Sequence, residues 1–521
     1  MWCKCVVWLC VLWHVSECGH VLVVFPMPGR SHTTLGDAVV RSLLEGGHNV
    51  TYITTFSQET DQRLRVINIS PPGDQYDSDG DRPRLTELLK SSLPSHHELT
   101  TGAKYAVRAL RHVDVQDLIR QKQVTFDVVV AEWFYSGLLA PLAEVFECPL
   151  IWYSSVDATW MNLQLVHEPP NPAYAVDLQA SNMASEIPSV GERAYRIWRQ
   201  AYLTVWQYYV TNYIESPLYY EQYQLAIQRR GRTPPPYDQL LYSGAVMLIN
   251  SQPTLGQNLP LPSSAKYVGG HHLGYAETLT KELKAIMAAS KSGVIYVNLG
   301  STISDELPSE SAELLLRLFR QWDQTVIWKY ADNLMNVPAN VHLMEWAPQQ
   351  AILKHPKTIL MLSHAGHLSY IEAMYSGVPL IGIPVFGDQL LTMDLVANRG
   401  KGIKVHYTDK LVFKLKEAVN QILVNETYRN NAKMASFILH QHLVPPSQEL
   451  RHWIELVIAT KGAAPLRSPA LALNMMERYH IDVMALVFMM YWFYTKVAKV
   501  VKVYWDDWGT DCGKEEKEKS E

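Results

Sequence analysis

The sequence has 521 residues, of which 48% are hydrophobic and 19% are charged, and its formal net charge is −5. This composition excludes a disordered chain, and the absence of a long basic run argues against a nucleic-acid-binding surface. At roughly 150 residues per domain, the length predicts about two to four units, and an enzyme with a large core is favoured.

The chain begins with an apolar stretch typical of a secretory signal peptide. Lys4 precedes an uncharged run from Cys5 to Val15, and small residues follow up to Cys18. We therefore expect residues 1–18 to be cleaved; a first core strand is the alternative. Because most of the cysteines lie in this segment, the remaining protein is expected to fold without disulfides.

Residues 19–255 alternate between strand and helix patterns. The runs typical of strands are 20–26, 49–56, 126–134, 148–154 and 244–251. The helical stretches are 35–47, 85–122 and the Tyr- and Trp-rich 190–230, and 71–84 is a polar loop. A loop that contains His32 separates the first strand from the first helix.

A second alternating series follows a Pro-rich connection. Its predicted strands are 293–301, 325–330, 341–346, 358–364, 379–385 and 402–406. Its predicted helices are 309–321, 349–355, 368–377 and 390–400. Two such series predict an α/β protein with two doubly wound domains, 19–255 and 256–445, that face a cleft. Residues 446–480 are expected to form helices that pack back toward the first domain.

Near the C-terminus, the uncharged run Val483 to Thr495 extends to Lys502 if the intervening lysines snorkel. We expect a membrane-spanning helix at 481–502 and a cytosolic tail at 503–521; an interfacial amphipathic helix is the alternative. With a cleaved signal, this predicts a single-pass type I protein whose folded domains are lumenal. Lys517 and Lys519 form a dilysine pattern, which favours the endoplasmic reticulum membrane.

Three N-x-S/T sequons mark possible glycosylation sites, at Asn49, Asn68 and Asn425. Asn49 lies in a predicted strand and is expected to be buried. Asn425 lies in a polar helix-like stretch and is the favoured site.

Several common binding motifs are missing. The sequence has neither a P-loop nor a well-placed dinucleotide fingerprint. Asp77 and Asp79 lie in a polar loop, and the pairs His96–His97 and His271–His272 lack companion ligands at useful spacing. We therefore expect neither a metal nor another cofactor.

The segment 346–389 contains polar residues at successive strand ends. His364 ends a buried strand, and the next helix begins after a small-residue turn, an arrangement that binds phosphate through free N–H groups and the helix dipole. Glu372 lies about two turns further on and suits ribose hydroxyls. Trp346 could stack on a base, and Asp388 is expected to end a third strand at the same edge.

The spacings W-x-P-Q, H-x-G-x-x-S-x-x-E and D-Q resemble the signature of the UDP-dependent glycosyltransferases, which include UDP-glucuronosyltransferases and UDP-glucosyltransferases. The resemblance covers nearly the whole chain, and the segment HAGHLS (residues 364–369) is most similar to the insect membrane-bound UDP-glucosyltransferases. It implies a GT-B fold with two Rossmann-like domains. It also implies inverting, metal-independent transfer of a hexose from a UDP-sugar to a hydroxyl of a small lipophilic acceptor, for detoxification or conjugation.

The resemblance also implies a role for each matching residue. Trp346 and Ala347 match uracil contacts and Gln349 and Glu372 ribose contacts, while His364, Gly366 and Ser369, with Ser301 as a weaker match, belong to the diphosphate site. Asp388 and Gln389 match contacts to the donor sugar. His32 matches the catalytic base, and Glu132 aligns with its partner carboxylate.

The chain departs from the family pattern at three positions: Ala365 replaces a glycine, Leu368 replaces an asparagine and Glu132 replaces an aspartate. If position 365 needs a positive φ, alanine costs about 1 kcal/mol or more. A non-catalytic binding protein is therefore one alternative. Glucose is the expected sugar, because 364–389 contains no Arg or Lys, and glucuronate is the other alternative. A homo-oligomer is possible on this evidence.

Overall fold

The computed structural model describes residues 18–57, 59–70, 96–178, 187–275, 278–300, 303, 307–331, 334–408 and 410–518. The chain divides into two compact units, residues 1–467 and 468–521. The signal-peptide prediction lies almost wholly outside the described residues, as do Ser301, Lys519 and the polar loop 71–84.

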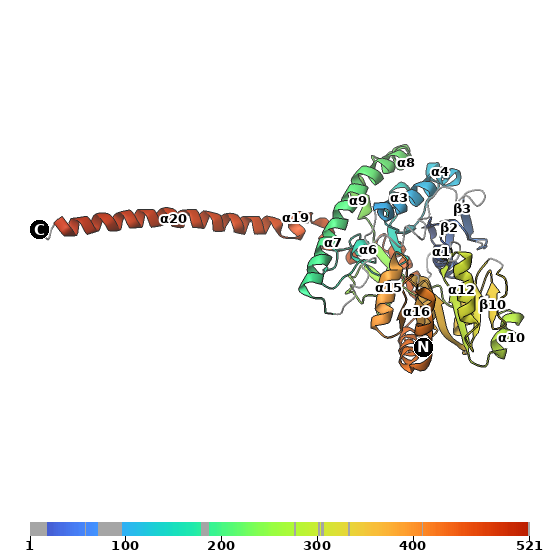
Figure 1. Ribbon diagram of the computed structural model, residues 1–521. Helices are drawn as coiled ribbons and strands as arrows, with labels where there is room; N and C mark the ends of the chain where they lie inside the picture. The colour runs from blue at the N-terminus through green and yellow to red at the C-terminus, as the bar shows by residue number, and fades with distance from the viewer. Residues whose placement is uncertain are drawn as a thin grey trace, which may run out of the picture. The chain divides into compact units, whose positions relative to one another are not determined.

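The first half of the larger unit is built on a seven-stranded parallel sheet with the order β3-β2-β1-β4-β5-β6-β7. Figure 1 labels β3 and β2, the strands at one edge of this sheet. Its strands are β1 His20–Phe25, β2 Asn49–Thr54, β3 Leu64–Asn68, β4 Val128–Glu132, β5 Leu150–Ser154, β6 Val246–Ile249 and β7 Ala265–Tyr267. Sequence analysis missed β3 and β7. Both are short edge strands, so they lack the long apolar run of a strand that has neighbours on both sides.

The second half contains a six-stranded parallel sheet with the order β10-β9-β8-β11-β12-β13. Its strands are β8 Val294–Asn298, β9 Thr325–Lys329, β10 Val341–Met344, β11 Thr358–Ser363, β12 Leu380–Gly382 and β13 Gly402–Lys404. Two doubly wound parallel sheets confirm the predicted α/β architecture.

Helices cover both sheets. Those of the first half are α1 Arg30–Glu45, α3 His96–Arg111, α4 Val113–Arg120, α5 Pro141–Phe146, α6 Trp160–Leu163, α7 Val190–Tyr209, α8 Ser216–Arg229 and α9 Tyr237–Leu241. Those that follow are α10 Lys281–Ala289, α12 Ser309–Phe319, α13 Gln349–Lys354, α14 His367–Tyr375, α15 Asp388–Asn398, α16 Leu411–Val424, α17 Glu426–Leu439 and α18 Pro446–Ala459. A π-helical segment, Val210–Glu215, joins α7 to α8.

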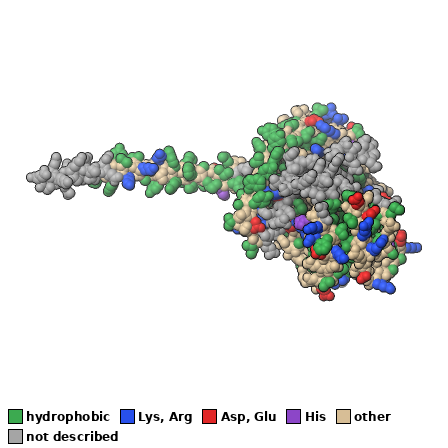
Figure 2. Space-filling view, in the orientation of Figure 1, with side chains coloured by type: hydrophobic (Ala, Val, Ile, Leu, Met, Phe, Trp, Pro, Cys, Tyr) green, Lys and Arg blue, Asp and Glu red, His purple; other side chains and the backbone are tan. Residues whose placement is uncertain are grey.

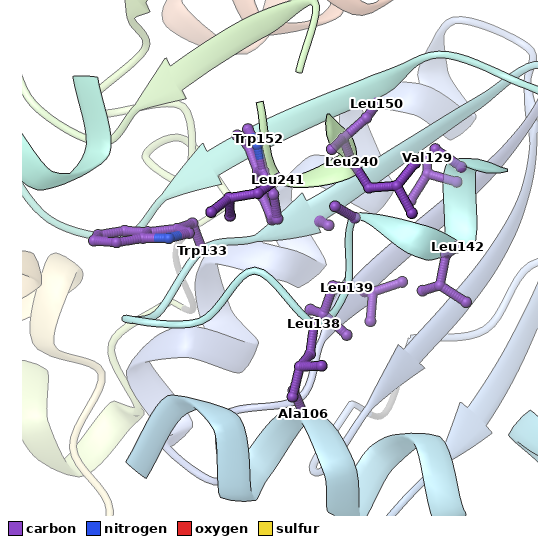
Figure 3. Close-up of a cluster of buried hydrophobic side chains, with 14 of the residues drawn as sticks. Ala106, Val129, Trp133, Leu138, Leu139, Leu142, Leu150, Trp152, Leu240 and Leu241 are labelled. Carbon is purple, nitrogen blue, oxygen red and sulfur yellow. The ribbon is translucent and has the colours of Figure 1, made fainter. Parts of the chain in front are cut away.

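The first sheet has a separate hydrophobic core on each face. One core packs against α3, α5 and α8 and contains the side chains labelled in Figure 3, among them Trp152 and Leu139. The other packs against α1 and α18, where Leu450 and Ile454 are buried in the same cluster as Leu35. The chain therefore returns to the first sheet after it has built the second.

The smaller unit consists mainly of α20, Ile481–Glu518, preceded by the short α19, Met475–Arg478. Its segment Ile481–Trp505 is long and apolar enough to cross a membrane, and hydrophobic side chains line it (Figure 2). The helix continues well past the predicted span of 481–502.

All three sequon asparagines are exposed. The expectation that Asn49 is buried was wrong, because Asn49 is the first residue of β2 and only the rest of that strand enters the sheet. Asn425 caps α17, and its side-chain oxygen accepts a hydrogen bond from the Thr427 N–H.

Candidate active site

His32 lies in the first turn of α1 and not in a loop as predicted, because the helix begins at Arg30. Gly29 is extended and forms the N-cap, and the Thr33 N–H donates to its carbonyl oxygen over 3.0 Å. The first turn is polar, so the apolar periodicity on which the prediction depended begins only later, at Leu35.

The imidazole of His32 is hydrogen-bonded through Nδ1 to the carboxylate of Glu132, the last residue of β4. The side chain of Glu132 is fully buried, and the Ser155 hydroxyl donates to the same carboxylate oxygen. The pair forms because β1 and β4 are parallel neighbours, so the loops after their carboxyl ends meet at one edge of the sheet.

The charges around His32 control its protonation. Burial alone would lower the pKa of the imidazole, but the carboxylates of Glu132 and Asp388 outweigh this and raise the pKa above its usual value. With Nδ1–H donated to Glu132, Nε2 is the nitrogen that can accept a proton. The geometry therefore suits a general base.

A small cavity with mostly apolar walls adjoins this pair. It is lined by Pro26, Met27, Gly102, Tyr105, Ala106, Glu132, Phe134, Ser136 and Leu139. Apolar side chains therefore lie beside the Glu132 carboxylate.

In the second half, Trp346 follows β10 and is 51% exposed, so a face of its ring is accessible. The Lys329 ammonium at the end of β9 lies 4.7 Å from the ring centroid. The Arg30 guanidinium of α1 lies 5.8 Å from the same centroid, although it comes from the first half. The ring is thus bordered by two cations, which suits an anionic ligand with a flat base.

Gln349, Ser369 and Glu372 lie together, as the ribose and phosphate predictions require. The Gln349 amide donates to Glu372 Oε2 over 2.5 Å and to Ser369 Oγ over 3.1 Å. Sequence analysis missed two supporting residues. The Gln350 amide donates to Glu372 Oε1 over 3.1 Å, and the Asn298 amide donates to the side-chain oxygen Oε1 of Gln349 over 2.7 Å. Asn298 could have been noticed as the polar end of a buried strand.

The turn between β11 and α14 positions His364. Ala365 has a φ of 67°, so this position does adopt the left-handed conformation that glycine favours. The His364 ring packs against Gly300, where a Cβ atom would come within 2.7 Å of it. Burial lowers the pKa of His364, which favours the neutral ring as a hydrogen-bonding partner for phosphate. Ala347 and Gly366 flank the same region, and Leu368 packs instead against the core of the first sheet.

Asp388 and Gln389 begin α15 and do not end a strand as predicted, because β12 stops at Gly382 and the chain turns at Gly387. Asp388 Oδ2 accepts a hydrogen bond of 2.8 Å from the His367 N–H and so caps α14. The side-chain oxygen Oε1 of Gln389 accepts hydrogen bonds from the N–H groups of Val385 and Phe386. Gln389 therefore supports the turn in which it lies, and Asp388 supports the start of α14.

Comparisons with known proteins agree with this arrangement. A family model described as "UDP-glucoronosyl and UDP-glucosyl transferase" matches residues 19–508. The chain belongs to this family.

The relatives of this UDP-glycosyltransferase include enzymes named as glucosyltransferases and enzymes named as glucuronosyltransferases. It is 24% identical to UDP-glucosyltransferase 2 of Dactylopius coccus, over 94% of each chain. It is 33% identical to human UDP-glucuronosyltransferase 2A3 over 43% of each chain. The solved structure of CalG4, the calicheamicin glycosyltransferase, matches with a TM-score of 0.56 and 17% identity, over 85% of this chain and 98% of that one. The two sheets thus form the GT-B fold of such glycosyltransferases.

Proposed function

We propose that this UDP-glycosyltransferase transfers glucose, with inversion and without a metal ion, to a hydroxyl of a small lipophilic acceptor. The observation that carries the proposal is the His32–Glu132 pair: Glu132 lines a cavity with mostly apolar walls, and the charge of the donor-side residue Asp388 acts on His32. A base in that position can reach an acceptor hydroxyl on one side and the donor sugar on the other.

In the proposed reaction, His32 Nε2 takes the proton of the acceptor hydroxyl while that oxygen attacks the anomeric carbon of the sugar. The bond from this carbon to the β-phosphate oxygen breaks, and UDP leaves with the electron pair. Glu132 stabilises the imidazolium that forms. The N-terminus of α14, with His364 and Ser369, stabilises the charge that develops on the diphosphate.

Glucose is proposed over glucuronate because a glucuronate carboxylate needs a basic partner near Asp388 and Gln389. The segment 364–389 contains no Arg or Lys, and Lys329 and Arg30 lie beside the Trp346 ring, where the base and not the sugar is expected. We further propose that α20 anchors the protein in the endoplasmic reticulum membrane as a type I protein, with the folded unit lumenal and its activity used in conjugation or detoxification.

The test is UDP release from UDP-glucose and UDP-glucuronate, each with a panel of phenolic, steroid and pigment acceptors and each with and without EDTA. We expect faster release from UDP-glucose, no effect of EDTA and no transfer by a His32→Ala variant that still binds UDP. Exclusive use of UDP-glucuronate would overturn the choice of sugar. Sensitivity to EDTA would overturn the metal-free mechanism.

The alternative of a non-catalytic binding protein is favoured by Ala365, whose φ of 67° is unfavourable for alanine. The cost is about 1–2 kcal/mol. Glycine at this position would relieve it but would lose a buried methyl group, which contributes about 0.8 kcal/mol. Because the two effects are similar in size, alanine is not expected to disable the site.

We therefore expect Ala365→Gly to change turnover less than about twofold and the free energy of unfolding by less than about 1 kcal/mol. Turnover and thermal unfolding would be measured on the same preparation. A rise in turnover of an order of magnitude or more would show that Ala365 does impair the site.

A further inference from the structure

Two adjacent histidines, His271 and His272, are fully buried, yet the proposed reaction uses neither of them. They follow β7 in a tight turn in which the His271 N–H donates to the Val268 carbonyl oxygen over 3.2 Å. Gly270 precedes them with a φ of 94°, and a Cβ atom there would lie 2.6 Å from the Tyr375 hydroxyl of α14. The turn is therefore pressed against the helix that contains Glu372.

His271 faces the first sheet. Its Nδ1 lies 3.0 Å from the Val268 carbonyl oxygen, and its Nε2 lies 3.3 Å from the Tyr153 hydroxyl of β5. Burial lowers the pKa of His271 to about 3, so the ring is neutral. A neutral ring that donates from Nδ1 accepts at Nε2, which matches these two partners. The Leu35 carbonyl oxygen of α1, 3.4 Å from Nε2, brings the same ring close to the helix that carries His32.

His272 faces the second sheet. Its Nε2 lies 3.4 Å from Glu372 Oε1, and both side chains are buried. Neither ring nitrogen of His272 has a hydrogen-bond partner among the residues that the structure describes. A buried imidazole N–H without a partner costs about 1–3 kcal/mol, so an acceptor within reach is expected to be used.

The carboxylate of Glu372 has acceptor sites available for the Nε2–H of His272. It receives hydrogen bonds from the amides of Gln349 and Gln350, one on each oxygen. An ionised carboxylate offers about four lone-pair sites, so two donors leave sites both for His272 and for ligand hydroxyls.

We infer that His272 is a positioning residue for the donor nucleotide: its Nε2–H holds the Glu372 carboxylate in the orientation that receives the ribose hydroxyls of UDP. The inference rests on the proposed function, in which Glu372 binds ribose. It also gives the connection between the two sheets a role, because His271 lies close to α1 and its neighbour His272 lies beside Glu372.

The test compares the affinities for UDP and 2′-deoxy-UDP by calorimetry on the full-length protein. The ratio of the affinity for UDP to the affinity for 2′-deoxy-UDP isolates the contact with the ribose 2′-hydroxyl, and a residue that only fills space would not change this ratio. His272→Gln places an amide N–H near the position of Nε2, whereas His272→Asn places it near Nδ1. We expect Asn to lower the ratio about tenfold, mainly through weaker UDP binding, while Gln keeps it near the wild-type value. The KM for the UDP-sugar should rise with Asn, with a smaller change in kcat.

Two further variants separate the possible failures. His271→Gln is the matched control and should keep the ratio, because His271 faces away from Glu372. Glu372→Gln should abolish the discrimination; if it does not, the ribose assignment itself is wrong. If Glu372→Gln abolishes it but His272→Asn leaves it unchanged, or if Asn and Gln at 272 reduce it equally, the role of His272 is overturned.

Discussion

At the scale of single residues, the pKa of His32 is set by the charges of its neighbours. Its imidazole is partly buried, and only the nearby carboxylates raise its pKa above the usual value. A base with a raised pKa is protonated, and therefore inactive, up to a higher pH. The acid limb of the activity profile should accordingly lie above the ordinary histidine value of about 6.5.

We predict that Glu132→Gln moves this acid limb to lower pH and also reduces the maximal rate. The neutral amide no longer raises the pKa of His32, and it no longer stabilises the imidazolium that forms during transfer. The measurement is kcat/KM against pH with saturating acceptor. A limb that stays in place in the variant would show that another group titrates there.

Trp346 is the second residue whose role can be isolated. We predict that Trp346→Ala weakens the binding of UDP and of the UDP-sugar by the same factor, roughly tenfold to hundredfold, because stacking on a base is worth about 1–3 kcal/mol. Titration calorimetry with each ligand is the measurement. Unchanged affinity for UDP would mean that the ring contributes only its contacts with Lys329 and Arg30.

At the scale of elements, α14 connects the proposed phosphate and sugar sites, because its first N–H is bound by Asp388. Removal of a capping side chain costs about 0.5–2 kcal/mol, whereas asparagine caps about as well as aspartate. Asp388 should therefore have two separable roles, one in capping α14 and one in binding the sugar.

We predict that Asp388→Asn lowers turnover with UDP-glucose but keeps the melting temperature and the affinity for UDP. Asp388→Ala should lower turnover and, because the cap is lost, also the melting temperature and the affinity for UDP. Thermal unfolding and calorimetry distinguish the two variants. Equal stability of both would argue against the capping role.

At the scale of the whole molecule, the connection between the two sheets is held by hydrogen bonds to its backbone. Arg399, just after α15, donates to the carbonyl oxygens of Thr254, Leu255 and Gly256, and Lys401 donates to Thr254 as well. His367 Nε2 lies 2.7 Å from the carbonyl oxygen of Asn250. The first residue of α14 is therefore hydrogen-bonded directly to the residue that follows β6 of the first sheet.

The membrane anchor also belongs to this scale. We predict that the full-length protein stays in the membrane pellet after alkaline carbonate extraction, because Ile481–Trp505 is long enough to span the hydrocarbon. Truncation after His480 should release the protein to the supernatant. Extraction of the full-length chain by carbonate would instead support a helix that lies on the membrane surface.

The sequence by itself determined the two α/β series and the order of the donor residues. Both are local: buried strands are continuous apolar runs, and Trp346, His364 and Glu372 belong to one stretch whose spacing is typical of the family. The structure confirms most of these strands and helices. It adds the edge strands β3 and β7, which were not predicted, and α1 and α15 begin earlier than predicted.

The tertiary structure decided how distant side chains meet. The resemblance implied that His32 and Glu132 are partners, and the fold brings these two residues together because β1 lies beside β4 in the sheet. His272 reaches Glu372 because the turn after β7 packs against α14, and no periodic pattern encodes that contact. Asp388 caps a helix that begins well before it in the chain. Strand order and the packing of connections are cooperative properties of the whole core, whereas periodicity reports only on the burial of each segment.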